Sequence, residues 1–496
     1  MARTEDDRKV VVKAGLAFPR PQRDFEYVEG WGMTVGSQSR VLRPTNVVEI
    51  AAAYAIARAD RVSIGLRGTG CSYGDASVNE RGHLLELTHM NRFLDFDPST
   101  GVANVEAGVT IEQLWKTVLP HGYWPRVVSG TMFPTLGGAL AMNIHGKNNF
   151  AVGTIGDAVR EFDIVLASGE VRHCSRAENA DLFHAAIGGF GMLGTIARLS
   201  IETKKVYSGL LEVRAKSTRT LRETFEYFEA KKATSDYLVA WIDCFGRKED
   251  LGRGLIHDAR YLRPGEDPDP SATLNVKSQE LPKNILAVVP KSEVWRALRL
   301  FNHDAGMRFV NFSKYLAGQI EERQEPHRQS HAAFAFLLDY VPNWKWAYGR
   351  GGGRGLIQYQ AFLPKETALF VFEEILRRNQ RARHVPYLGV LKRHRPDPFW
   401  LTHATDGWSL ALDYKVTPEN RAELWRHCAD LTRLVLDNGG KFYFAKDLVI
   451  ESADMVRMYP PDKLARFCAL KRELDPELLL QTNLYRRVLA ALVASP

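Results

Sequence analysis

The apolar positions of the first 205 residues alternate between short runs and helical spacings, with many glycines between them. Residues 41–60, VLRPTNVVEIAAAYAIARAD, predict a helix led by a proline, and residues 62–68, VSIGLRG, predict a buried strand ending in glycine. The same reading predicts strands at 83–88 and 101–110, a hairpin over 162–174 turning at Ser168 and Gly169, and helices at 111–122 and 180–189. This dense pattern, without an internal repeat, predicts an α+β domain.

The pattern changes after Lys205, where the segments become longer and the glycines fewer. Residues 264–272, PGEDPDPSA, predict an exposed loop, and residues 349–355, GRGGGRG, contain too much glycine for a regular element. Residues 357–364 and 408–416 alternate like strands of a sheet that has one open face.

From about Gly440 the chain resembles a segment that returns to close the fold. We therefore predict a first domain over residues 10–205, a second over 206–440, and a C-terminal segment over 441–496 that returns to the first.

Length and composition set limits on these domains. The chain has 496 residues, of which 45% are apolar and 25% charged, as expected for a soluble globular protein with two or three cores. Its N-terminus mixes charges instead of forming a signal peptide, and no apolar run reaches the roughly 20 residues that span a bilayer. We expect a cytoplasmic protein, or one peripheral to the inner membrane. The five cysteines are scattered without CxxC pairs, which excludes a disulfide framework and predicts no metal site.

The formal net charge is +8, and part of it is concentrated in residues 377–384 and 392–396. Nucleic-acid binding is one interpretation, but no RNA-binding signature accompanies the charge, and we expect no nucleic-acid partner. Attraction to an anionic substrate or an acidic membrane surface, or a solvated basic face, explains the charge equally well.

Three glycine-rich stretches precede residue 195: GLRGTGCSYGD (65–75), SGTMFPTLGGALAMNIHGKN (129–148) and GGFGMLG (188–194). The last fits G-x-G-x-x-G, but a predicted helix precedes it and a predicted strand follows, which is the reverse of a Rossmann site. A phosphate-binding P-loop is also absent. Three such loops in one domain predict a long ligand held by backbone N–H groups, and such groups suit a pyrophosphate.

In this order and spacing, these stretches resemble the FAD-binding domain of the vanillyl-alcohol-oxidase-type (PCMH-type) flavoproteins. Within that superfamily the chain is similar to the decaprenylphosphoryl-β-D-ribose 2′-oxidases, through GWGMT, IHGKN, LIQYQAFLP, GWSLALDY, FYFAKD and DPELLLQTNLYRR. The resemblance covers nearly the whole chain and is weakest over 206–335. It implies a two-domain α+β fold: the FAD-binding domain, and a substrate domain with an antiparallel sheet and flanking helices.

The resemblance also implies that FAD binds non-covalently, with its pyrophosphate over residues 67–72. In the wider superfamily a histidine that bonds covalently to the flavin stands at the position of Cys71. We interpret Cys71 as a small buried filler, with a flavin thioether as the alternative. The cofactor-binding residues implied are Arg67, Gly68, Thr69, Gly70, Cys71, Ser72, Tyr73, Gly130, Thr131, Gly137, Gly138, Asn143, His145, Gly146, Gly191, Ile196 and Lys446.

Family roles transfer to two catalytic candidates. Lys446 matches a lysine that contacts flavin and substrate, where a cation stabilises developing negative charge. His145 matches a histidine near the flavin ring, as a general base or as a hydrogen-bonding or space-filling group. The family's pocket cysteine is Ala411 here, so that thiol is missing. The substrate-binding residues implied are Tyr73, His145, Trp241, Gln358, Gln360, Lys392 and Lys446, with Gln358 and Gln360 on one strand face.

The function implied is FAD-dependent oxidation of a secondary hydroxyl of a sugar, by hydride transfer to flavin N5. The expected substrate is a polyprenyl-phosphate-linked pentose, oxidised at the 2′ position as half of an epimerisation. A short-chain reductase partner and peripheral membrane contact are implied with it. Two alternatives stay open: an aldonolactone or alditol oxidase that uses O2 on a soluble sugar, and a non-catalytic flavin- or nucleic-acid-binding protein.

Overall fold

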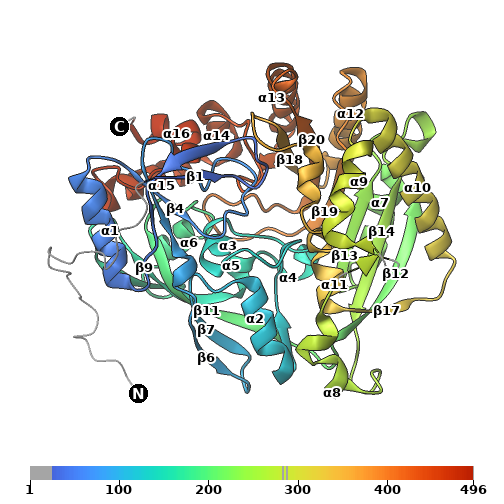
Figure 1. The fold of residues 1–496 in the computed structure, drawn as a ribbon, viewed down its shortest axis with the longest axis horizontal. Helices are drawn as coiled ribbons and strands as arrows, with labels where there is room; N and C mark the ends of the chain where they lie inside the picture. The colour runs from blue at the N-terminus through green and yellow to red at the C-terminus, as the bar shows by residue number, and fades with distance from the viewer. Residues whose placement is uncertain (1–24, 282–283, 286–288, 495–496) are drawn as a thin grey trace.

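The computed structural model describes residues 25–281, 284–285 and 289–494, so residues 10–24 of the first predicted domain lie outside it. Figure 1 shows two sheet systems side by side, with the C-terminal helices packed beside the N-terminal one. The fold mixes helices and antiparallel sheets as the resemblance predicts, and the two-domain flavoprotein architecture is confirmed.

The N-terminal part contains a six-stranded antiparallel sheet and a three-stranded parallel sheet. The first has the order β10 (Val171–Ser175), β9 (Val159–Val165), β11 (Thr195–Lys205), β7 (Val102–Glu106), β6 (Phe93–Asp97), with β8 (Tyr123–Pro125) on β11. The second has the order β3 (Val41–Leu42), β5 (His83–Glu86), β4 (Ile64–Arg67). The remaining elements here are the hairpin β1 (Glu26–Glu29)–β2 (Gly36–Ser39) and helices α1 (Val47–Ala59), α2 (Ile111–Val118), α3 (Leu136–Ala141), α4 (Asn149–Val152), α5 (Ile155–Ala158) and α6 (Ala180–Ala186).

Local signals explain where the first helix forms. The side chain of Asn46 caps α1 by accepting the backbone N–H of Glu49 at 3.0 Å. Its buried residues Ile50, Ala53, Tyr54 and Ala57 follow helical spacing, so one face packs on the core. The predicted hairpin is also confirmed, since β9 and β10 pair antiparallel. The stretch GFGMLG lies between α6 and β11, which confirms the rejection of a Rossmann site.

The C-terminal part is built on an eight-stranded antiparallel sheet. Its order is β17 (His327–Ser330), β12 (Leu210–Thr218), β14 (Gly254–Tyr261), β13 (Tyr237–Ile242), β19 (Leu388–His394), β20 (Gly407–Val416), β18 (Gly355–Pro364), β21 (Lys441–Phe442). The other elements are α7 (Leu221–Lys231), α8 (Pro270–Thr273), β15 (Asn284–Ile285), β16 (Val289–Pro290), α9 (Val294–Phe301), α10 (Asp304–Glu322), α11 (His331–Ala335), α12 (Ala368–Arg381) and α13 (Arg421–Asp437).

Two predictions about this part need correction. Strands β18 and β20 are buried on both faces, not on one, because α12 and α13 pack on one side and the N-terminal part covers the other. The predicted loop over 264–272 is exposed only in part. Asp267 is buried within it and accepts hydrogen bonds from the hydroxyls of Ser208 and Thr273, which tie the loop down before α8. The glycine-rich stretch before β18 is an exposed loop, as predicted.

The C-terminal helices are α14 (Ser452–Met458), α15 (Pro461–Leu474), α16 (Asn483–Val488) and α17 (Ala490–Ala494). They return to the N-terminal part (Figure 1), where the backbone of Ile64 in β4 exchanges hydrogen bonds with Leu479 and Gln481. β21 nevertheless belongs to the eight-stranded sheet. The segment thus touches both parts, and the exact domain boundaries stay a prediction.

The two basic stretches do not form one positive surface. In α12, Arg377, Arg378 and Arg381 form ion pairs with Glu373 and Glu374 of the same helix. The second stretch lies largely inside the protein: Arg393 is buried and pairs with Glu229 and Asp406, and His394 is also buried. Much of the charge is therefore neutralised locally or turned inward, which gives nucleic-acid binding no support. In the part of the chain that is described, no helix combines the length and apolar composition that a bilayer crossing needs.

Candidate active site

One cavity of about 420 Å³ lies where the two sheet systems meet. All three glycine-rich loops contribute to its wall, and strands β13, β18, β19 and β20 with the segment before α14 complete it. That segment lies beside the first loop, where the backbone N–H of Tyr73 donates to the carbonyl oxygen of Ala445 at 2.7 Å. The sequence-predicted residues that line it are Arg67, Gly68, Thr69, Gly70, Cys71, Ser72, Tyr73, Gly130, Thr131, Gly137, Gly138, His145, Gly191, Ile196, Trp241, Gln358, Gln360, Lys392 and Lys446.

Two predicted cofactor residues, Asn143 and Gly146, do not line the cavity. The side chain of Asn143 donates to Asp397 at 3.0 Å and accepts the backbone N–H of Gly156 at 3.2 Å, so its polar atoms are used behind the wall. A Cβ at Gly146 would lie 2.4 Å from the side-chain oxygen of Asn148, so a larger residue here would have to displace that side chain. Their roles toward a cofactor stay predictions.

The loop after β4 has the properties of a ligand-binding turn. None of the backbone N–H groups of residues 68–72 donates a hydrogen bond to the described chain. Gly70 has a φ of +73°, and a Cβ there would lie 2.2 Å from the Arg67 guanidinium. That guanidinium donates to the carbonyl oxygen of Ser77 at 2.9 Å and so connects the start of the loop to the residues that follow it. Unpaired donors that converge on a cavity form a site for an anionic group.

Cys71 is not the buried filler that we predicted. Its side chain is only partly buried and faces the cavity, with Sγ 3.5 Å from the hydroxyl of Thr69. Burial raises the pKa of this thiol above its usual value, so the neutral form prevails at neutral pH. A neutral thiol is a poor nucleophile.

Lys446 reaches the cavity from the segment after β21. Its Nζ lies 3.7 Å from the centre of the Tyr73 ring. Burial lowers the pKa of the ammonium group to about 7, and the negative charge of Asp413 limits this decrease. The neighbouring Asp447 does not pair with Lys446, because it accepts a hydrogen bond from Arg487 at 2.8 Å. Lys446 therefore presents its charge to the cavity instead of to a sequence neighbour.

Asp413 does not line the cavity but contacts a residue that does, and the sequence reasoning assigned it no role. It is fully buried on β20, and its Oδ1 accepts a hydrogen bond of 2.6 Å from Gln358, its direct partner on β18. Its other oxygen has no partner in the described chain, and burial raises the pKa of this carboxyl to about 6. A signal was present, since Asp413 is two residues after Ala411 and therefore shares its strand face.

Gln358 and Gln360 both line the cavity, as their spacing predicts. The Gln360 amide donates to Nε2 of His145 at 3.2 Å, and Nδ1 of His145 has no partner in the described residues. Burial, and then the charge of Lys392, hold the pKa of His145 well below its usual value. The imidazole is therefore neutral at neutral pH, with an unused nitrogen at a buried position.

Three further lysines line the cavity. Lys392 has its pKa lowered to about 8 by burial. Lys147 donates to the carbonyl oxygen of Ala335 at 3.1 Å, and Lys314 on α10 lies 4.9 Å from the ring centre of Trp241. The sequence reasoning assigned no role to Lys147 or Lys314, and Lys314 lies where the resemblance is weakest.

These residues fit a flavin dinucleotide. The unpaired N–H groups of residues 68–72 suit its pyrophosphate, and the glycine loops leave room for a flat, extended ligand. Protonated Lys446 and Lys392 suit the negative charge that a reduced flavin or an ionising hydroxyl develops. In the described residues, no group of three or more His, Cys, Asp or Glu side chains has the arrangement of a metal site.

Comparison with known proteins agrees with this geometry. The family model described as "FAD binding domain" matches residues 39–175. Decaprenylphosphoryl-beta-D-ribose oxidase of Mycolicibacterium smegmatis is 31% identical over 468 residues, which cover 92% of this chain and 96% of that protein. The chain belongs to the decaprenylphosphoryl-β-D-ribose oxidase family.

More distant relatives act in the same broad class of chemistry. A putative D-arabinono-1,4-lactone oxidase of Neurospora crassa is 23% identical across 90% of this chain and 83% of its own length. L-gulonolactone oxidase of Mus musculus is 28% identical across 42% of this chain and 47% of its own length. This chain is an FAD-dependent oxidoreductase of the sugar-oxidising type that acts on CH–OH groups. The alternative of a non-catalytic binding protein is therefore wrong.

Proposed function

We propose that this enzyme oxidises a secondary hydroxyl of a pentose carried on a polyprenyl phosphate, as the 2′-oxidase half of an epimerisation. The observation that carries the proposal is the 31% identity over nearly the whole length of a relative named for that substrate. The cavity supports it, because cationic side chains for a phosphate, Lys392 and Lys314, stand among mainly apolar walls.

Different residues of the chain bind the cofactor, position the sugar and stabilise the developing charge. Bound FAD, held by residues 68–72 and the other glycine loops, supplies the acceptor for the hydride. Tyr73 and Trp241 confine the sugar, and Gln358 and Gln360 offer amide groups that orient its hydroxyls. Lys446, as an ammonium group, stabilises the negative charge that develops on the sugar oxygen as the hydroxyl proton passes to solvent water in the cavity.

For His145 we propose a hydrogen-bonding role and not that of general base. Nε2 already accepts from Gln360, so the ring hydrogen is on Nδ1, which faces no described partner. The strongly lowered pKa also makes the imidazole a weak base. An N–H donor at this position suits a flavin or sugar oxygen.

The pH dependence of flavin reduction tests the role of Lys446. The protonated fraction of Lys446 falls as pH rises through its pKa of about 7, so the rate of anaerobic bleaching should fall on the alkaline side with a midpoint near 7. The charge of Asp413 raises the pKa of Lys446. Asp413→Asn should therefore move the midpoint to lower pH, measured by stopped-flow bleaching across pH. Asp406→Asn, on the loop before β20, is the matched control, and an unmoved midpoint in Asp413→Asn contradicts the coupling.

Non-covalent FAD is a further expectation of this proposal, supported by the neutral Cys71 thiol. Acid precipitation of the purified enzyme should release all the yellow colour into the supernatant, as measured by flavin absorbance in both fractions. Colour that stays in the wild-type pellet but is lost from the pellet of Cys71→Ser would establish a thioether instead.

A second candidate function is oxidation of a free aldonolactone or alditol by O2, which the lactone-oxidase relatives favour. Anaerobic bleaching across free and lipid-linked pentoses separates the two. We expect bleaching by a prenylphosphoryl ribose and not by free lactones or alditols. Bleaching only by the free compounds, with stoichiometric peroxide in air, would support the alternative. A short-chain reductase that consumes the keto sugar and contact with a membrane surface belong to the leading proposal.

A further inference from the structure

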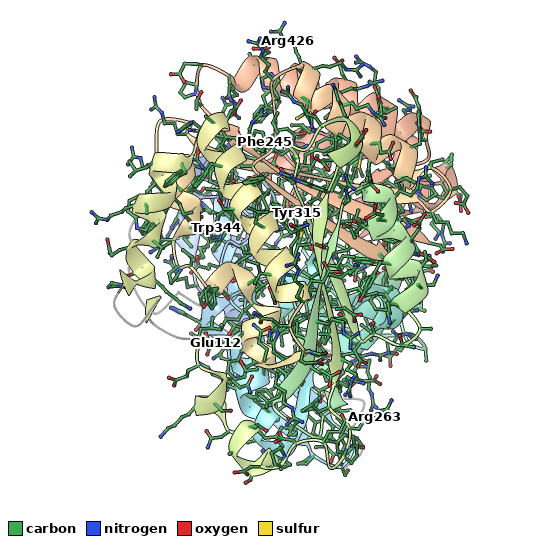
Figure 2. All side chains as sticks on the ribbon, turned by 90° about the vertical axis from the view of Figure 1, so that its right-hand side faces the viewer. Glu112, Phe245, Arg263, Tyr315, Trp344 and Arg426 are labelled. Carbon is green, nitrogen blue, oxygen red and sulfur yellow. The ribbon has the colours of Figure 1, made fainter. Side chains whose placement is uncertain are left out.

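Helix α10 has two faces of different character. Asn311, Tyr315 and Gly318 face the eight-stranded sheet and are buried, and Tyr315 packs with Trp241 of β13. The helix runs along the outer side of strands β12 and β14, where Figure 2 labels Tyr315. Lys314, next to Tyr315, lines the active-site cavity. One helix thus separates the cavity from the outside of the molecule.

The opposite face of α10 is apolar and open. Phe309, Phe312, Leu316 and Ile320 are spaced to form one stripe, and each is between 43% and 61% exposed. Phe301 of α9 extends the stripe, with its ring stacked 6.3 Å from that of Phe309. An exposed row of large apolar side chains on a 19-residue helix is unusual for a surface that faces only water.

Positive charge lies next to this stripe. An open hollow lined by Phe309 and Phe312 is also lined by Arg247, Arg253 and Arg308 and by one carboxylate, Asp250. Arg253 is neutralised by Asp243. Within the described residues, neither Arg247 nor Arg308 takes part in an ion pair. The guanidinium of Arg308 lies 5.5 Å from the ring centre of Phe245. The guanidinium groups of Arg247 and Arg308, without an ion pair to the described residues, thus lie in the same hollow as two exposed aromatic rings.

We infer that the outer face of α10, with Arg247 and Arg308, docks on the surface of an anionic lipid bilayer. Aromatic and aliphatic side chains on one helix face insert at the boundary between headgroups and acyl chains, and neighbouring arginines attract anionic headgroups. Docking here places the cavity wall directly above the lipid, where a polyprenyl-linked sugar is carried. This last point rests on the proposed function; the binding itself does not.

The test is flotation of the FAD-loaded full-length protein with phosphatidylcholine vesicles, with and without phosphatidylglycerol. We expect binding to the vesicles that contain phosphatidylglycerol, weak binding to phosphatidylcholine alone, and weaker binding as salt rises. The double variant Phe309→Ser/Phe312→Ser should lower the partition coefficient at least tenfold, and Arg308→Glu should lower it for the anionic vesicles. Phe370→Ser on α12, where the side chain is 62% exposed, is the matched control and should bind as the wild type does.

Bound-FAD absorbance shows whether each variant is folded, independently of any sugar. Wild-type protein that stays unbound to anionic vesicles, or a double variant that binds them as well as the wild type, would overturn the inference. A dimer in size-exclusion chromatography that the double variant splits would do the same, because a second copy then covers this face. Failure here leaves the bleaching test of the proposed function unaffected.

Discussion

Lys446→Ala lowers the rate of anaerobic flavin bleaching by roughly 10²–10³-fold, the usual cost of removing a group that stabilises charge in the transition state. FAD stays bound, because the substitution leaves the glycine loops and the backbone N–H groups of residues 68–72 unchanged. Stopped-flow absorbance with a prenylphosphoryl ribose measures the rate, and the flavin-to-protein absorbance ratio measures the retained cofactor.

Two companion variants make this result specific. Lys441→Ala changes a lysine of the same segment that does not line the cavity, so it should bleach at close to the wild-type rate. Lys446→Arg keeps the positive charge but changes its position, and it should recover part of the rate. Reduction of Lys446→Ala at the normal rate would refute the role of this lysine.

Arg487→Ala lowers the free energy of unfolding by about 3–5 kcal/mol, because it leaves buried carboxylates without their cation. The guanidinium contacts both oxygens of Asp75, at 2.9 and 2.8 Å, and Asp447 at 2.8 Å. Both aspartates are buried, one at the end of the first glycine loop and one beside Lys446. This ion-paired group joins α16 to both walls of the site, so FAD occupancy should fall as well.

Urea unfolding measures this loss, with Arg457→Ala as control. Arg457 forms a solvent-exposed pair with Asp437, which is worth about 0–1 kcal/mol. Burial already raises the pKa of Asp447, and removal of Arg487 raises it further, so the folded variant binds protons more readily than its unfolded chain. The stability deficit relative to wild type should therefore shrink as pH falls toward about 5. Equal losses in the two variants would contradict the structural role of Arg487.

The local features of this site were readable in the sequence. The glycine loops, with predicted elements on either side, indicated a long ligand held by backbone groups and excluded a Rossmann site. Strand periodicity placed Gln358 and Gln360 on one face, and helical periodicity predicted the helix that forms α1. Each of these depends on a few neighbouring residues, whose backbone geometry is set by steric and hydrogen-bonding rules of short range.

Contacts between distant segments were not readable in the same way. Strand alternation suggested an open face for β18 and β20, but α12 and α13 cover it, and only packing decides what lies on a sheet. For the basic residues 392–396 the sequence left a solvated face, an anionic substrate and an acidic surface open. In the structure Arg393 and His394 lie buried on β19, where Arg393 pairs with Glu229 of another element.

By itself, then, the sequence determined the order of elements and a long ligand held by backbone groups, because these follow from local pattern. The cofactor class and most of the residues along the cavity wall came from the family resemblance that the same motifs carry. Only the tertiary structure decided the electrostatics of the site, where the charge of Asp413 raises the pKa of Lys446 and Asp447 pairs with Arg487. It also decided that Lys314 lines the cavity while Phe309 is exposed on the outer surface. Charge and pKa depend on burial and on distances between side chains far apart in the chain, and those exist only once the chain is folded.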